Sequence, residues 1–153
     1  ARARLHATSL LLGVMRQASE FSREYALERQ AFGRPIAHHQ GLAFLITDMR
    51  AAVDTARLLA HEAAWRVDSR LACGAEAAVA YAEAIEAASF VGPNGVQILG
   101  GHGFMQDYPV EKYMREARAL GLALGGLDAA REEAGRALCE SPASVEFSWV
   151  GAS

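Results

Sequence analysis

The stretch HHQGLAFLITDMRAAVDTARLLAHEAAWRVD, residues 38–68, decides the fold class. Apolar residues recur in it at alternating steps of three and four, at Leu42, Leu45, Met49, Val53, Ala56, Ala60, Ala63 and Val67. This spacing places all of them on one face of an α-helix. A stripe of this length predicts a long helix, running from about His38 to Asp68, in an antiparallel bundle.

The segments on either side of this stretch also have a helical pattern. From about Leu5 to Arg29 an apolar stripe recurs at the same steps, and Gly33 and Pro35 end it. A third helix is predicted from about Gly74 to Leu99, with a face of small side chains that lets helices approach closely. Because an internal proline costs ~3 kcal/mol in a helix, the sequence GPNG at residues 92–95 predicts a kink or a break.

The remaining sequence predicts shorter elements. A short helix follows Pro109, glycines mark an irregular stretch at residues 121–126, and a last helix covers about Leu127 to Leu138. The predicted fold is therefore all-α, an antiparallel four-helix bundle with one short additional helix, formed by residues 1–140. Residues 141–153 are predicted to be a tail or linker, and we expect the chain to be a piece of a longer polypeptide.

The composition narrows the function classes. A hydrophobic content of 52% indicates a globular domain, and a net charge of −3 gives no reason to expect nucleic acid or an anionic membrane surface as a partner. No apolar run reaches the roughly 20 residues that span a bilayer. Cys73 and Cys139 have neither the spacing of a metal site nor that of a disulfide framework, so we predict no metal and a reducing, cytoplasmic location.

Two segments carry candidate binding residues. The first is RQAFGRPI, residues 29–36, and it runs into His39 and Gln40; the second is QILGGHGF, residues 97–104, and it runs into YPVEK at residues 108–112. The guanidinium of Arg29 suits a pyrophosphate, although cations are also generally favoured at helix C-termini. His39 and Gln40 open a helix, where free N–H groups attract phosphate, or they are simply a polar helix start.

Together, RQAFG and QILGGHGF resemble the C-terminal helical domain of the acyl-CoA dehydrogenases, flavoenzymes that oxidise fatty acyl thioesters. The resemblance covers about residues 4–138. It implies that the cofactor is FAD and that the matching arginine and phenylalanine contact the FAD of a neighbouring subunit, with Phe32 also free to serve the core. The residues implied to contact FAD are Arg29, Phe32, Ile36, His39, Gln40, Gln97, Gly100 and Gly101.

The same resemblance concerns the substrate and the catalytic base. Arg4 stands where many members keep an arginine that steadies the CoA end of the substrate; the alternative is a solvated arginine near a frayed helix end. The position at which most members keep a catalytic glutamate is Leu124. A subset of members carries the glutamate on the first helix instead, where this chain has Ala1 and Ala3. No catalytic residue is therefore predicted.

Three hypotheses follow from these features. The first is an FAD-supporting domain that acts on an acyl-CoA as part of a homo-oligomer or of a hetero-oligomer with a glutamate-bearing paralogue. The second is a divergent member with another base or another reaction. The third is a helical bundle that serves only as an interaction scaffold. Retention of FAD by the full-length protein separates the third hypothesis from the first two.

Overall fold

A computed structural model describes residues 1–140 of the chain, and the predicted tail at 141–153 lies outside the described residues. The described part contains five α-helices and one two-stranded hairpin, which confirms the all-α prediction. The helices are α1 (Arg2–Glu28), α2 (Gln40–Asp68), α3 (Gly74–Leu99), α4 (Val110–Gly121) and α5 (Gly126–Glu140). The strands β1 (Gln30–Ala31) and β2 (Arg34–Pro35) form the hairpin, and short 3₁₀ helices η1 (Ile36–His38), η2 (Gly100–Phe104) and η3 (Ala123–Gly125) join elements.

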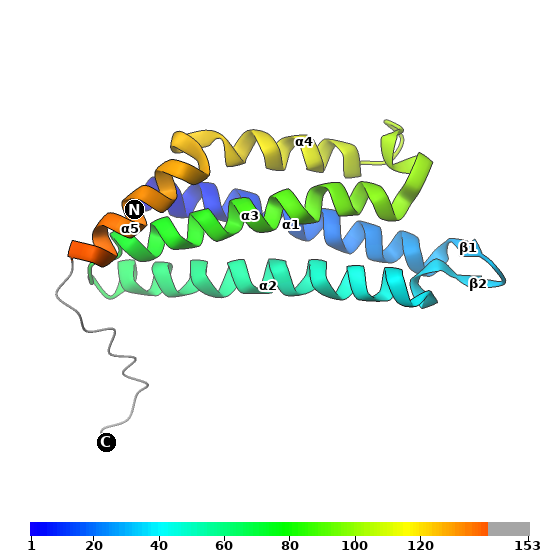
Figure 1. Cartoon of the computed structure of the whole chain (residues 1–153), viewed down its shortest axis with the longest axis horizontal. Helices are drawn as coiled ribbons and strands as arrows, with labels where there is room; N and C mark the ends of the chain where they lie inside the picture. Colours follow the sequence, from blue (N-terminus) through cyan, green and yellow to red (C-terminus); the bar gives the residue numbers. More distant parts are fainter. Residues whose placement is uncertain (141–153) are drawn as a thin grey trace, which may run out of the picture.

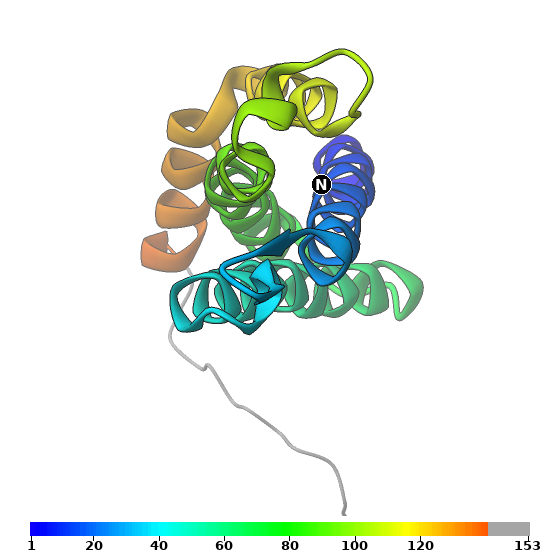
Figure 2. The same cartoon turned by 90° about the vertical axis from the view of Figure 1, so that its right-hand side faces the viewer.

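Helix α3 is the centre of the domain, because it contacts each of the other four α-helices. Figures 1 and 2 show α1, α2 and α4 arranged around α3 along its length, and α5 crossing one end of α3. The hairpin and η2 lie at one end of the bundle, and the N-terminus and the connection between α4 and α5 lie at the other (Figure 1). These two ends carry the candidate functional residues.

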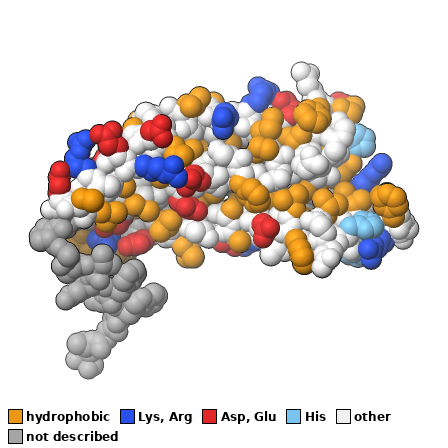
Figure 3. Space-filling view, viewed as in Figure 1, with side chains coloured by type: hydrophobic (Ala, Val, Ile, Leu, Met, Phe, Trp, Pro, Cys, Tyr) orange, Lys and Arg blue, Asp and Glu red, His pale blue; other side chains and the backbone are white. Residues whose placement is uncertain are grey.

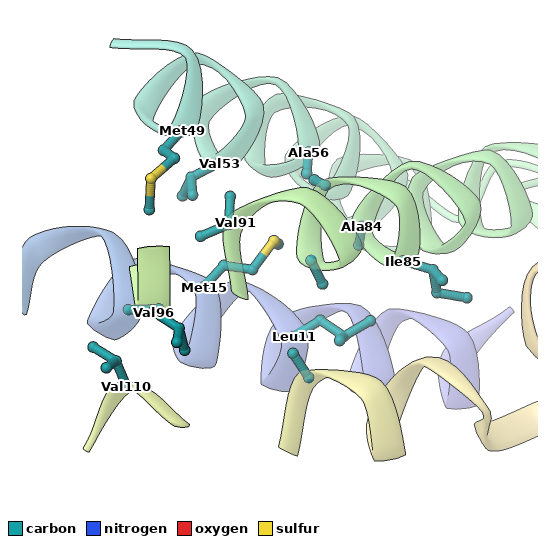
Figure 4. Packing of buried hydrophobic residues seen from close by; sticks show 14 of the residues in the cluster. Leu11, Met15, Met49, Val53, Ala56, Ala84, Ile85, Val91, Val96 and Val110 are labelled. Atoms are coloured by element: carbon teal, nitrogen blue, oxygen red, sulfur yellow. The ribbon is translucent and has the colours of Figure 1, made fainter. Parts of the chain in front are cut away.

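The hydrophobic core lies between the helices and contains buried side chains from all five of them. One cluster of buried side chains, drawn in Figure 4, includes Leu11 and Met15 of α1, Met49 and Val53 of α2 and the buried face of α3. Much of the α3 face consists of buried alanines, which let the surrounding helices approach closely. The small-residue face that the sequence predicted for this helix therefore explains why it occupies the centre.

The predicted break at residues 92–95 is wrong, since α3 continues through Pro93 to Leu99, and the alternative of a kink stays a prediction. A Cβ added to Gly92 would lie 3.2 Å from Met114 Cα of α4, and one added to Gly95 would lie 3.0 Å from Ser22 Oγ of α1. The two glycines thus allow close contact with helices on two sides, and this packing outweighs the local cost of the proline. The amide nitrogen Nδ2 of Asn94 also donates to the carbonyl of Phe90 at 2.9 Å.

The start of the second helix also differs from the prediction. The chain turns through the β1–β2 hairpin, with positive φ angles of 52° at Phe32 and 80° at Gly33, and then forms η1. Helix α2 begins at Gln40 rather than at His38, and His39 caps it with an extended backbone. Among the helices of residues 1–140, none combines the length and the apolar character that crossing a bilayer requires.

Candidate functional site

An open groove of about 370 Å³ lies at the hairpin end of the bundle and is referred to here as the terminal groove. The terminal groove brings together two segments that are far apart in the sequence, the end of α1 with η1 and the end of α3 with η2. Five of its residues are among the predicted cofactor contacts. Its lining consists of Tyr25, Arg29, Ile36, Leu42, Gln97, Ile98, Leu99, Gly100, Gly101 and His102.

Arg29 and the glycine pair give the terminal groove its chemistry. The Arg29 side chain is exposed and makes no hydrogen bond or ion pair with a residue in the described part of the chain. Its main-chain carbonyl accepts from the N–H of Ile36 at 2.8 Å, so the backbone of Arg29 is fixed while its guanidinium stays free. Gly100 has a φ of +58°, and a Cβ at Gly100 or Gly101 would meet nothing within 4 Å. The main chain there is open to a ligand.

The other three predicted contacts lie on the hairpin and at the start of α2. The His39 ring donates from Nε2 to the carbonyl of Ala31 at 3.2 Å and accepts at Nδ1 from Arg34 at 3.2 Å, an arrangement that suits a neutral imidazole. Phe32 contacts the His39 ring edge-on at a centroid distance of 5.9 Å, yet its side chain is 95% exposed. The suggestion that Phe32 also serves the core is therefore wrong.

An aromatic group beside the terminal groove is not among the predicted site residues. The hydroxyl of Tyr25 lies 2.7 Å from Nδ1 of His102, and the His102 ring stacks on Tyr108 at a centroid distance of 5.1 Å. In the sequence, Tyr25 falls on the apolar stripe of residues 5–29, a pattern that by itself indicates a core position. Only the position of η2 beside the end of α1 shows that Tyr25 and His102 also line the groove.

Arg4 lies at the opposite end of the bundle and is buried, which excludes the solvated arginine of the sequence analysis. Its guanidinium forms an ion pair with Glu133 and donates from Nη2 to the carbonyl of Ala129 at 3.3 Å, and both partners belong to α5. Arg4 thereby fastens α5 to α1. Its predicted contact with the CoA end of a substrate stays a prediction.

Tyr81 of α3 holds the connection between α4 and α5. Its side chain is fully buried, and its one hydroxyl proton is shared between the carbonyls of Leu120 at 2.9 Å and Ala123 at 2.7 Å. Burial raises the pKa of the Tyr81 phenol above its usual value, with the positive charge of Arg4 acting in the opposite direction, so the group remains a protonated donor at neutral pH. No pattern in the sequence marks Tyr81, because its partners lie about 40 residues further along the chain.

Leu124 comes directly after Ala123, one of the two carbonyl partners of Tyr81, and its backbone conformation is unusual for a residue other than glycine. Its φ and ψ angles are 54° and 28°, in the left-handed region, and Gly125 and Gly126 continue with φ angles of 86° and 70°. The predicted irregular stretch at residues 121–126 is thus confirmed. The Leu124 side chain is 47% exposed, so the connection presents it at the surface of the domain.

The terminal groove and the Leu124 connection lie at opposite ends of the bundle (Figure 1). At a rise of 1.5 Å per residue, about 24 Å of helix separates Tyr81, which holds the Leu124 connection, from Gln97 in the terminal groove. Within residues 1–140 no group of histidine, cysteine, aspartate or glutamate side chains has the arrangement of a metal site.

Comparisons with known proteins agree on one family. The family model described as "Acyl-CoA dehydrogenase, C-terminal domain" matches residues 1–139. An acyl-CoA dehydrogenase of Bacillus subtilis (strain 168) is 43% identical over 107 residues, which cover 70% of this chain and 28% of that protein. This chain thus spans less than a third of that relative's length.

Solved structures give the same result. A chain of the ChsE4-ChsE5 complex from Mycobacterium tuberculosis is 34% identical with a TM-score of 0.86, over 92% of this chain and 38% of that one. The structure described as "PigA with FAD and proline" is 26% identical with a TM-score of 0.86, over 90% of this chain and 36% of that one.

Proposed function

The chain belongs to the acyl-CoA dehydrogenase family, as its C-terminal helical domain, and from this premise we propose that it supplies FAD contacts and an oligomer interface but no catalytic base. The observation that carries the proposal is the convergence of Arg29, Gln97 and the Gly100–Gly101 pair on the terminal groove. The substrate in this proposal is an acyl-CoA, bound by the larger assembly to which the domain contributes.

The groups of the terminal groove fit the adenosine diphosphate half of FAD. An unpaired guanidinium offers a planar fork of donors to a pyrophosphate, and the open main chain at Gly100 and Gly101 allows close approach. Gln97 presents an amide that suits adenine, and the exposed ring of Phe32 offers a flat apolar surface. When bound, FAD supplies the acceptor for the hydride of the acyl thioester; this chain's own residues bind and orient it.

The length of α3 supports an oligomer. About 24 Å of α3 separates Gln97 in the terminal groove from Tyr81, which holds the Leu124 connection, and the groove and this connection lie at opposite ends of the bundle (Figure 1). We propose that one domain offers its groove to one cofactor and position 124 to the cofactor of another chain. This arrangement requires at least two chains, and it accords with the neighbouring-subunit contacts that the resemblance implies.

An exposed row on α2 offers a surface for the second chain. Phe44, Leu58 and Trp65 are 60%, 70% and 59% exposed, and they are separated by multiples of about two helical turns, so they share one face. Figure 3 shows further hydrophobic side chains along the length of the face that it presents. Large exposed apolar side chains arranged in a row are typical of interaction surfaces.

The proposed absence of a base rests on position 124. Removal of a weakly acidic α proton requires a positioned acceptor, and an alkyl side chain cannot act as one. We propose that a glutamate-bearing paralogue supplies this group in a hetero-oligomer. This proposal is supported by the ChsE4-ChsE5 structure. It is a complex of two differently named chains, and a chain in it has the same fold as this domain.

The test uses the full-length protein, purified as an assembly of identical chains. We expect stoichiometric FAD and no rapid flavin reduction on mixing with a series of acyl-CoAs in a stopped-flow spectrophotometer. Leu124→Glu should then give measurable flavin reduction by at least one acyl-CoA, because a positioned general base typically contributes ~10²–10⁴-fold.

The alternatives predict different outcomes. Rapid reduction by the unmodified homo-oligomer would show that a base exists outside this domain and would favour a divergent member. Absence of FAD from the full-length protein would favour a domain that serves only as an interaction scaffold. Co-purification with a glutamate-bearing paralogue would support the hetero-oligomer directly.

A further inference from the structure

The connection between α4 and α5 has a conformation that its own sequence does not favour. Leu124 adopts left-handed backbone angles, which clash sterically for residues that carry a Cβ. Such a conformation persists only where the surrounding structure holds it, and it is common at functional sites. Groups from elsewhere in the structure must therefore hold Leu124 in this conformation.

A side chain from α3, that of Tyr81, holds the connection before Leu124. The Tyr81 hydroxyl bridges the carbonyl of Leu120, in the last turn of α4, and the carbonyl of Ala123, directly before Leu124. Carbonyls at a helix C-terminus lack the usual intrahelical partner, and the phenol adds a donor from α3 to the main-chain N–H groups of Leu122 and Gly126, which also reach the carbonyls of Leu120 and Ala123. One donor thus fixes the chain both where it leaves α4 and where it enters the strained residue.

The far side of the connection is held independently. Arg4 of α1 donates to the carbonyl of Ala129 and pairs with Glu133, which fixes the first turns of α5. Gly125 and Gly126, both with positive φ angles, span the short distance between the two anchored ends. Side chains from α1 and α3, together with the main-chain bond from the Gly126 N–H to the Ala123 carbonyl, therefore hold the direction in which residue 124 leaves the main chain.

We propose that Tyr81 is a positioning residue, which holds the 120–126 connection so that the side chain at 124 is presented to the substrate of the assembled protein. This inference rests on the proposed function for its meaning, because it treats position 124 as part of a flavin and acyl-CoA site. Its consequence is that the backbone geometry for a base remains in place although the base is absent. In the Leu124→Glu variant, the glutamate would then have the same backbone orientation as Leu124.

The first arm of the test measures the connection itself in the full-length protein. Tyr81→Phe removes only the hydroxyl, and we expect hydrogen–deuterium exchange in peptides covering residues 120–127 to become about five- to tenfold faster, with exchange in α1 and α2 unchanged. Tyr113→Phe is the matched control, since the hydroxyl of Tyr113 on α4 makes no hydrogen bond to a residue in the described part of the chain. Unchanged exchange in Tyr81→Phe overturns the inference.

The second arm asks whether this anchoring matters for chemistry. In the Leu124→Glu background, adding Tyr81→Phe should slow flavin reduction by an acyl-CoA by about 10- to 100-fold, because small misplacements of a reacting group have effects of this size. FAD content and the acyl-CoA dissociation constant, measured from the flavin spectrum, should stay the same. An equal rate in the two variants overturns the positioning role, and so does a loss confined to FAD content.

The two arms keep this inference separate from the proposed function. If Leu124→Glu alone gives no flavin reduction although FAD is bound, the assignment of position 124 to the catalytic site is wrong. The role of Tyr81 toward substrate is then wrong with it, whatever the exchange rates show. If Leu124→Glu is active and the exchange and rate effects both appear, the positioning role of Tyr81 is established.

Discussion

Two glycines of η2, separated by one residue, are expected to respond oppositely to the same added methyl group. A Cβ at Gly103 would lie 2.4 Å from the carbonyl oxygen of Val96 and 3.0 Å from its Cα, both main-chain atoms of α3. A Cβ at Gly101 would meet nothing within 4 Å, and Gly101 lines the terminal groove. Gly103→Ala is thus a test of packing, and Gly101→Ala is a test of cofactor contact.

The magnitude for Gly103→Ala follows from the clash. Relieving it from 2.4 Å to 3.0 Å requires the turn to move by 0.6 Å away from α3, and neither partner is a flexible side-chain end. Overpacking of this kind costs about 1–3 kcal/mol. For a chain of this size the free energy corresponds to a fall of roughly 2–12 °C in Tm.

The expected result for Gly101→Ala is the reverse. The free energy of unfolding of the 153-residue chain should change by less than about 0.5 kcal/mol, as for other unobstructed surface positions. In the full-length assembly, however, the methyl group occupies space that the proposal gives to FAD, and the affinity should fall by roughly 5- to 150-fold. Denaturant unfolding and reconstitution of the apoprotein with FAD measure the two quantities.

Either result can refute the reasoning. A Gly103→Ala variant with unchanged Tm would mean that η2 does not approach α3 as described. A Gly101→Ala variant that binds FAD as tightly as the unmodified protein would mean that the terminal groove is not the cofactor site, even if the fold is right.

Three further predictions concern two charged groups and the ability of the 153-residue chain alone to bind FAD. Arg29→Ala should weaken FAD binding by the full-length assembly by about 1.5–3 kcal/mol. Arg23→Ala should leave the dissociation constant nearly unchanged, because Arg23 is an exposed arginine of α1 with no ion pair to a described residue; equal effects would contradict the pyrophosphate role. The 153-residue chain alone should not retain FAD through gel filtration, because it supplies only part of the site, and a stoichiometric yellow fragment would disprove this. The Arg115 guanidinium holds the pKa of Glu111 below its usual value. The stabilisation of α4 by this pair is therefore present above the usual carboxyl pKa and is lost as pH falls through the lowered value. When Tm is measured against pH, Glu111→Gln should reduce the fall in Tm at acid pH.

The sequence alone predicted the positions of the five helices, apart from the break at residues 92–95, and five of the ten residues that line the terminal groove. Helical periodicity is a local property, so the stripe of residues 38–68 predicted α2 to within two residues of its observed start. The two motifs at 29–36 and 97–104 were grouped by resemblance, and the fold then placed Arg29, Ile36, Gln97, Gly100 and Gly101 around one groove. Their contact with FAD remains a prediction.

What only the tertiary structure decided concerns side chains whose environment comes from a distant part of the chain. Pro93 argues for a break when its neighbours in sequence are considered, but contacts of α3 with α1 and α4 outweigh that local cost. Arg4 is buried because α5 returns to it from residues 129–133, and Tyr81 finds two carbonyl partners in the connection after α4. These partners lie far along the sequence and are brought together by helix packing, which carries no local pattern from which periodicity or propensity could predict it.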